Sequence, residues 1–149
     1  MAGEKFMGYK ENIRPPLRVL AFIYFLLASL VIAIWASLPQ AIALISFISS
    51  ILLIALIAFS LRSKISVEED WLYVGRAKIE KKYIQEIVIL DKEQMRLERT
   101  RDIDPAAFLA LNFWEPRGVK IFLNDSRDKT PYWLVSTKRG KELAQALKS

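Results

Sequence analysis

The sequence predicts an α+β protein in which a transmembrane helical hairpin precedes a small antiparallel β half-barrel or sandwich with a C-terminal helix. Three observations predict this fold class. Residues 19–61 carry no Asp, Glu, Lys or Arg, short strand patterns recur after residue 62, and apolar residues take helical spacing near the end of the chain. The 149 residues leave room for a membrane segment and one small domain.

The uncharged run is too long for a single span. A straight helix of 43 residues measures about 65 Å at 1.5 Å per residue, roughly twice the hydrocarbon thickness of a bilayer. Pro39 and Gln40 interrupt the run at its centre, where proline removes a helical hydrogen bond and obstructs the preceding turn. Residues 19–38 and 41–61 are therefore predicted to be two membrane-spanning helices.

Basic residues at the two ends of this hairpin predict its orientation. Residues 1–18 and the first twenty residues after the hairpin are rich in Lys and Arg, whereas the connection near Pro39 has neither. Because basic residues next to a span stay in the cytoplasm, we expect residues 1–18 and the β-rich domain of residues 62–149 to be cytoplasmic. The expected lipid partner is the anionic inner leaflet.

Two other interpretations of the first span are disfavoured. A cleaved signal peptide has a shorter apolar core and is not followed directly by a second span. A soluble protein of this size could not cover 43 apolar residues. Within the hairpin, small residues predict a close helix contact, with random scatter as the alternative; they are Ser29, Ala33 and Ser37 on the first span and Ser46 and Ser50 on the second.

Strand signals dominate residues 62–149. Alternation and β-branched residues predict seven short antiparallel strands, at 65–68, 71–74, 77–80, 84–90, 107–112, 119–123 and 132–137. We expect the strands at 107–112 and 119–123 to form a hairpin, residues 96–104 to form a polar loop, and residues 141–148 to form a helix with Thr137 as its cap. This layout is similar to pleckstrin-homology-like folds, in which a C-terminal helix covers an open edge of a curved sheet.

The composition excludes several classes of chemistry. The chain has no Cys and no His, which removes disulfides, the usual zinc ligands and catalysis by thiol or imidazole. No cofactor and no metal are expected. The pI of about 9.6 is also typical of nucleic-acid binders, but no nucleic-acid motif is present, and an anionic membrane surface accounts for the charge.

A paired carboxylate is the strongest candidate for chemistry. Asp102 and Asp104 could hold a hard cation, although Asp104 before Pro105 more simply accepts backbone hydrogen bonds in a turn. Tyr132 and Trp133 are adjacent in a strand and point to opposite faces, so one is expected in the core and the other on a surface. The candidate binding surface consists of Arg101, Asp102, Asp104, Trp114, Tyr132 and Trp133.

Two motifs and a tryptophan carry a family resemblance. The motifs are Asp104–Leu109, before Trp114, and the more specific Thr130–Arg139, which reads Thr-Pro-Tyr-Trp-Leu-Val-Ser-Thr-Lys-Arg. Together with the hairpin they resemble an actinobacterial two-span membrane protein family, domain of unknown function (DUF) 3093. The resemblance implies a multi-pass protein of the bacterial inner membrane and no assigned activity.

Two functions remain open on these grounds. In the first, the chain is not an enzyme but a membrane-anchored binding or scaffolding module that meets lipid headgroups or a membrane or cytoplasmic protein at the cytoplasmic leaflet. In the alternative, it is a membrane-surface enzyme or enzyme subunit acting on a phosphate- or lipid-bearing substrate, with a divalent cation on Asp102 and Asp104 and a phosphate on Arg101.

Overall fold

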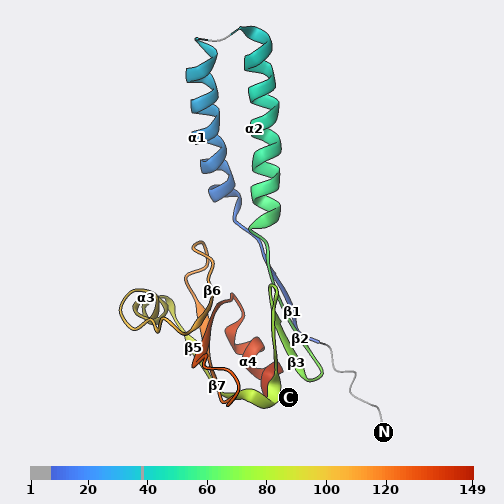
Figure 1. Ribbon diagram of the computed structural model, residues 1–149, viewed down its shortest axis with the longest axis vertical. Coiled ribbons are helices and arrows are strands. Elements are labelled where there is room, and N and C mark those ends of the chain that lie inside the picture. Colours follow the sequence, from blue (N-terminus) through green and yellow to red (C-terminus); the bar gives the residue numbers. More distant parts are fainter. Residues whose placement is uncertain (1–7, 38) are drawn as a thin grey trace. The chain divides into compact units, whose positions relative to one another are not determined.

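The computed structural model describes residues 8–37 and 39–149, which divide into two compact units (Figure 1). Residues 8–13 and Ser63–Ser149 form a β-rich unit, and Arg14–Arg62 form a helical hairpin. The hairpin is thus inserted into the chain between two strands of the same unit. The expected domain of residues 62–149 is extended by residues 8–13, because strand β1 (Lys10–Ile13) lies in its first sheet.

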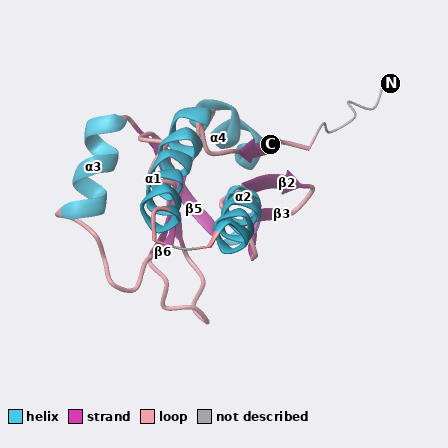
Figure 2. Cartoon of the chain, turned by 90° about the horizontal axis from the view of Figure 1, so that it is seen from above, coloured by secondary structure: helices cyan, strands magenta, loops and turns pink. Residues whose placement is uncertain are grey.

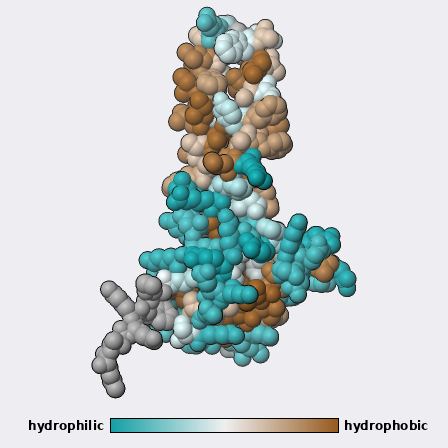
Figure 3. All heavy atoms as spheres, turned by 180° about the vertical axis from the view of Figure 1, so that it is seen from behind, coloured by the Kyte–Doolittle hydropathy of each residue, from teal (hydrophilic) through white to brown (hydrophobic). Residues whose placement is uncertain are grey.

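The hairpin consists of helices α1 (Leu17–Trp35) and α2 (Gln40–Ser60), which lie side by side in both views (Figures 1 and 2). Pro39 is the N-cap of α2, so the break falls where the sequence predicts it. Both helices are long and apolar enough to cross a membrane. Brown and tan apolar side chains cover much of the hairpin in the space-filling view (Figure 3), and Phe22 and Leu56 are among the exposed ones.

The contact between α1 and α2 differs from the predicted small-residue contact. Val31 of α1 and Ala43 and Ser50 of α2 are the buried residues of the hairpin, whereas Ser29 and Ala33 are exposed. Residues two apart on a helix lie about 200° apart around its axis. With Val31 turned inward, Ser29 and Ala33 therefore face away from α2, and the prediction is wrong for α1.

The first sheet is an antiparallel meander with the order β1-β2-β3-β4. It comprises β1, β2 (Ser63–Glu68), β3 (Trp71–Val74) and β4 (Ala77–Glu80). Gly75 turns the chain between β3 and β4 with a φ of 61°, a conformation that glycine adopts without steric cost. The strand β1 was not predicted, because the basic residues of the 1–18 segment indicated its topology and not a strand.

The second sheet has the order β5-β7-β8-β6, with β5 (Ile84–Leu90), β6 (Phe108–Ala110), β7 (Gly118–Leu123) and β8 (Tyr132–Ser136). A short 3-10 turn, η1 (Lys81–Tyr83), leads into it. The predicted hairpin between residues 107–112 and 119–123 is wrong. Both edges of β7 are taken by β5 and β8, so β6 pairs with β8 instead, and it does so in parallel.

Both sheets and the C-terminal helix α4 (Gly140–Lys148) share one apolar core. Ile65 and Leu72 come from the first sheet, Ile121 from the second, and Leu143 from α4, and all four side chains are almost fully buried. The α+β class, with antiparallel strands followed by a C-terminal helix, is confirmed. The likeness to pleckstrin-homology-like folds stays a prediction.

The predicted loop of residues 96–104 is wrong for residues 96–100, because helix α3 spans Lys92–Thr100, and residues 101–104 have no helix or strand, as expected. Asp91 accepts a hydrogen bond from the Gln94 backbone, and the Gln94 side chain accepts one from the Asp91 backbone, which forms a capping box. Met95 then anchors α3 in a second core with Leu90, Tyr132 and Leu134. Strand β8 is covered on both faces as a result.

Candidate functional site

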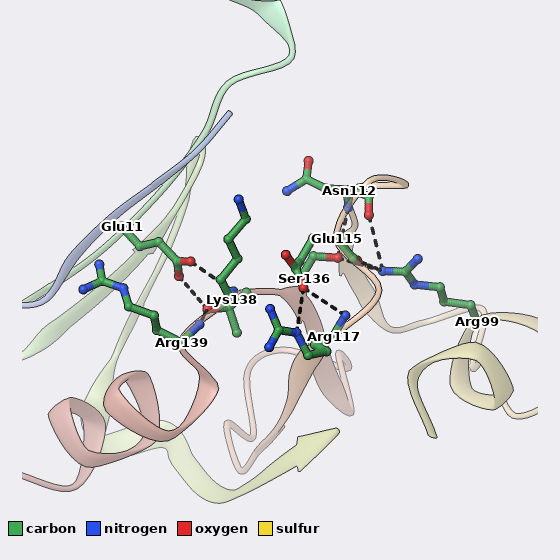
Figure 4. Close-up of polar contacts among 9 residues, drawn as sticks. Glu11, Arg99, Asn112, Glu115, Arg117, Ser136, Lys138 and Arg139 are labelled. Carbon is green, nitrogen blue, oxygen red and sulfur yellow. Dashed lines mark hydrogen bonds and ion pairs between the residues drawn. The ribbon is translucent and has the colours of Figure 1, made fainter. Parts of the chain in front are cut away.

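The C-terminal end of β8 gathers polar side chains from parts of the β-rich unit that are far apart in sequence. Ser136 and Thr137 are each 1% exposed, and Lys138 and Arg139 follow before α4 begins (Figure 4). On one side lies β1, and on the other lie α3 and the loop of residues 111–117. Two hydrogen-bond networks meet at this point.

The first network is centred on Glu11 of β1, whose carboxylate is buried. It accepts hydrogen bonds from the Tyr9 hydroxyl at 2.7 Å, from the Thr137 hydroxyl and from the Lys138 backbone N–H at 3.0 Å. Arg139 adds a bond to the Lys10 carbonyl at 2.8 Å. These contacts fasten the N-terminal strand to the end of β8, 126 residues away.

The surroundings affect the pKa of Tyr9 and the hydrogen bonds of Thr137 in this network. Burial, reinforced by the hydrogen bond to Glu11, raises the pKa of the Tyr9 hydroxyl well above its ordinary value. Thr137 does not cap α4 as predicted, since its hydroxyl donates to Glu11 and accepts from the Arg139 backbone at 3.1 Å. The first turn of α4 has no side-chain cap.

The second network is centred on Ser136. Its hydroxyl oxygen accepts from Arg99 Nη2 at 2.8 Å and from the Asn112 backbone N–H at 3.0 Å. The same Arg99 nitrogen donates to the Glu115 carbonyl at 3.0 Å, and burial lowers the pKa of Arg99. The Glu115 carboxylate, 3% exposed, pairs with Arg117 at 3.1 Å. The guanidinium of Arg99 therefore joins α3, the loop and β8.

Four residues of this site, Ser136, Thr137, Lys138 and Arg139, belong to the Thr130–Arg139 motif that carries the family resemblance. A family model described as a protein of unknown function, DUF3093, matches residues 8–147. The chain belongs to this family. No curated protein and no solved structure matches it. The expected DUF3093 membership is confirmed, while an actinobacterial source stays a prediction.

In this DUF3093 chain, the paired carboxylates engage in local contacts. Asp104 accepts a hydrogen bond from the Ala106 backbone at 2.8 Å, the turn role expected of it, and Asp102 pairs with the exposed Arg101 at 3.4 Å. Tyr132 joins them through the backbone, accepting from the Asp104 N–H at 2.9 Å. Within the described residues, no group of three or more Asp or Glu side chains could hold a metal ion.

The aromatic residues of the predicted DUF3093 surface are not exposed. Tyr132 and Trp133 point to opposite faces of β8, as expected, yet both are buried because α3 covers one face and the first sheet with α4 covers the other. Trp133 packs against Phe108 with ring centroids 4.6 Å apart. Trp114 packs against the main core, and its neighbour Phe113 is 69% exposed. The prediction that one of Tyr132 and Trp133 lies on a surface is therefore wrong.

The residues at the centre of these networks lie outside the candidate binding surface that the sequence predicts; they are Glu11, Arg99, Asn112, Glu115 and Ser136. One signal was present for Glu11. Apolar Tyr9 and Ile13 lie two residues on either side of Glu11, with polar Lys10 and Asn12 between them, which is the two-residue period of a strand buried on one face. An acid on that buried face requires hydrogen-bond partners. Arg99 contacts the loop 13 and 16 residues away and Ser136 of β8, 37 residues away, and contacts over such separations leave no local pattern.

Proposed function

We propose that this DUF3093 member is a multi-pass protein of the bacterial inner membrane, in which the hairpin anchors a cytoplasmic module that binds or scaffolds another molecule. One observation carries the proposal. Ile13 and Ser63 are paired across β1 and β2, and they lie four residues before α1 and three residues after α2. Both ends of the hairpin are thus tied to one point of the β-rich unit.

This pairing supports a topology with both ends of the hairpin on the same side of the membrane. Two spans that start and finish at paired residues return the chain to the side from which it came. Basic residues flank that point, among them Lys10, Arg14, Arg62 and Lys64, and the described part of the connection between the helices has none. The positive-inside rule then favours the cytoplasmic side for the β-rich unit.

Anchoring supplies a mechanism without a catalytic step. Confining a module to the membrane surface raises its effective concentration toward any partner that is held there, whether that partner is a lipid headgroup or a protein. The exposed Phe113 and Arg101 lie on the β-rich unit and are available to such a partner.

The topology is tested with single cysteines, because the chain has no native Cys to react. In intact cells, a membrane-impermeant maleimide is expected to label the Gln40→Cys variant. The Ser149→Cys variant is expected to react after permeabilisation alone. Labelling of Ser149→Cys in intact cells, or recovery of the protein in the supernatant without detergent, would contradict the proposal.

The binding role is tested by photo-crosslinking in living cells from positions 101 and 113, both exposed. A discrete adduct of a lipid or a single protein, dependent on light and on the position of the probe, supports a binding module. The matched control places the probe at exposed Glu86 on β5. Equal labelling patterns from all three positions would count against a defined surface.

A further inference from the structure

Helix α3 presents a cationic face to a small cavity. Lys92, Arg96 and Arg99 follow one another at helical spacings of four and three, so they share one side of the helix. Together with Thr100 and Pro116 they line a cavity of about 190 Å³. Among the described residues no carboxylate lines it, although Glu93 pairs with Arg96 at 3.0 Å nearby. That pair is exposed on both sides and holds Arg96 weakly.

One unpaired donor lies at this cavity. Arg99 Nε is buried within the described residues and has no acceptor, and Arg99 lines the cavity. A buried donor without an acceptor costs about 1–3 kcal/mol. The unpaired Nε–H therefore favours a ligand that brings an acceptor to Arg99.

The charge and the size of the cavity indicate what that group is. A phosphate has several oxygen acceptors and a negative charge, which match N–H donors and the guanidinium groups of Arg96 and Arg99. At about 30 Å³ for each water, the cavity has room for a phosphate with a few waters. The larger cavity at the start of α4, about 430 Å³, is a poorer match because Asp91 and Glu142 line it.

We propose that the α3 cavity, lined by Lys92, Arg96, Arg99, Thr100 and Pro116, is a binding site for a phosphate group. Lys92 and Arg96 contact the phosphate oxygens from the solvent side, and among the described residues the Lys92 side chain has no hydrogen-bond or ion-pair partner that would hold it back. Arg99 holds the inner side while it remains bonded to Ser136. The proposal rests on the proposed binding function, because it names the chemistry of the molecule that the module binds.

The test uses the full chain in phosphatidylcholine nanodiscs, titrated calorimetrically with inorganic phosphate. Arg96→Gln removes one guanidinium from the cavity, and the matched Arg76→Gln removes one from the exposed turn between β3 and β4, outside the cavity. Arg96→Gln is expected to weaken phosphate binding at least about tenfold. Arg76→Gln is expected to change it less than about twofold. Near-ultraviolet circular dichroism checks that both variants are folded.

A second arm separates a lipid headgroup from a soluble phosphate compound. If the source is a headgroup, phosphatidic acid in the nanodisc competes and weakens the binding of inorganic phosphate to the unaltered chain. If the source is soluble, phosphatidic acid has no effect while the difference between Arg96→Gln and Arg76→Gln persists. Either result supports the site.

Two results would overturn it, namely no phosphate binding by the unaltered chain in phosphatidylcholine, or equal affinities for Arg96→Gln and Arg76→Gln. A failure of this kind leaves the crosslinking and labelling results of the proposed function standing, so the two failures are distinguishable.

Discussion

Replacing Glu11 by alanine is expected to release the N-terminal strand from the rest of the β-rich unit. The carboxylate accepts three hydrogen bonds, and the Thr137 hydroxyl that donates one of them is 1% exposed and cannot turn to water. Bonds to a charged acceptor contribute about 1.5–3 kcal/mol each, and the losses overlap within one network. We expect Glu11→Ala to lower the free energy of unfolding by about 3–6 kcal/mol.

The assay combines two measurements on the full chain in detergent micelles. Equilibrium unfolding in urea, followed by near-ultraviolet circular dichroism, reports the loss for the whole β-rich unit. Hydrogen exchange at the amides of β1 reports where that loss occurs, and protection of Lys10–Ile13 is expected to fall first. Exposed Glu68 on β2 supplies the matched control, and Glu68→Ala is expected to stay within about 0.5 kcal/mol of the unaltered chain.

A loss below about 1 kcal/mol for Glu11→Ala would refute the reasoning, since it would mean that the three donors find other acceptors at little cost. Unchanged exchange at the β1 amides would refute it as well. In that case the strand would be held by its pairing with β2 alone.

Three further outcomes are expected. Gly118→Ala should destabilise the unit by about 1–3 kcal/mol in urea unfolding, because a Cβ there collides with the Val135 carbonyl oxygen and the Met95 side chain. Leu134→Ala, at a fully buried site, should cost about 2–5 kcal/mol in the same assay. Because burial raises the pKa of Tyr9, the folded state keeps its proton while the unfolded chain loses it above the ordinary pKa of about 10. Stability should therefore fall as the pH rises past 10, and the fall should be shallower in Tyr9→Phe; equal slopes would contradict this.

Patterns that depend on neighbours in the chain were predictable here. The two long helices, the break at Pro39 and the turn after β3 follow from local composition, and most strands follow from β-branched residues in alternation. Helix α3 was not predicted, because the many charged residues in this stretch are typical of a loop. The signal for the helix is the capping box that Asp91 and Gln94 form at its start. The turn role of Asp104 was predicted because an Asx turn is a contact between near neighbours.

The contacts of the candidate site could not be predicted in this way, because they join segments that no local sequence pattern connects. Tyr132 and Trp133 alternate faces, as any strand requires, but whether a face meets solvent depends on what packs against it, and here both faces are covered. Likewise, the charges of Lys92, Arg96 and Arg99 are visible in the sequence. Helix α3 places the three on one face, and the fold brings Pro116 of the loop beside them to complete the cavity. Local sequence sets backbone preference and hydropathy, whereas burial and the pairing of polar groups are properties of the packed chain.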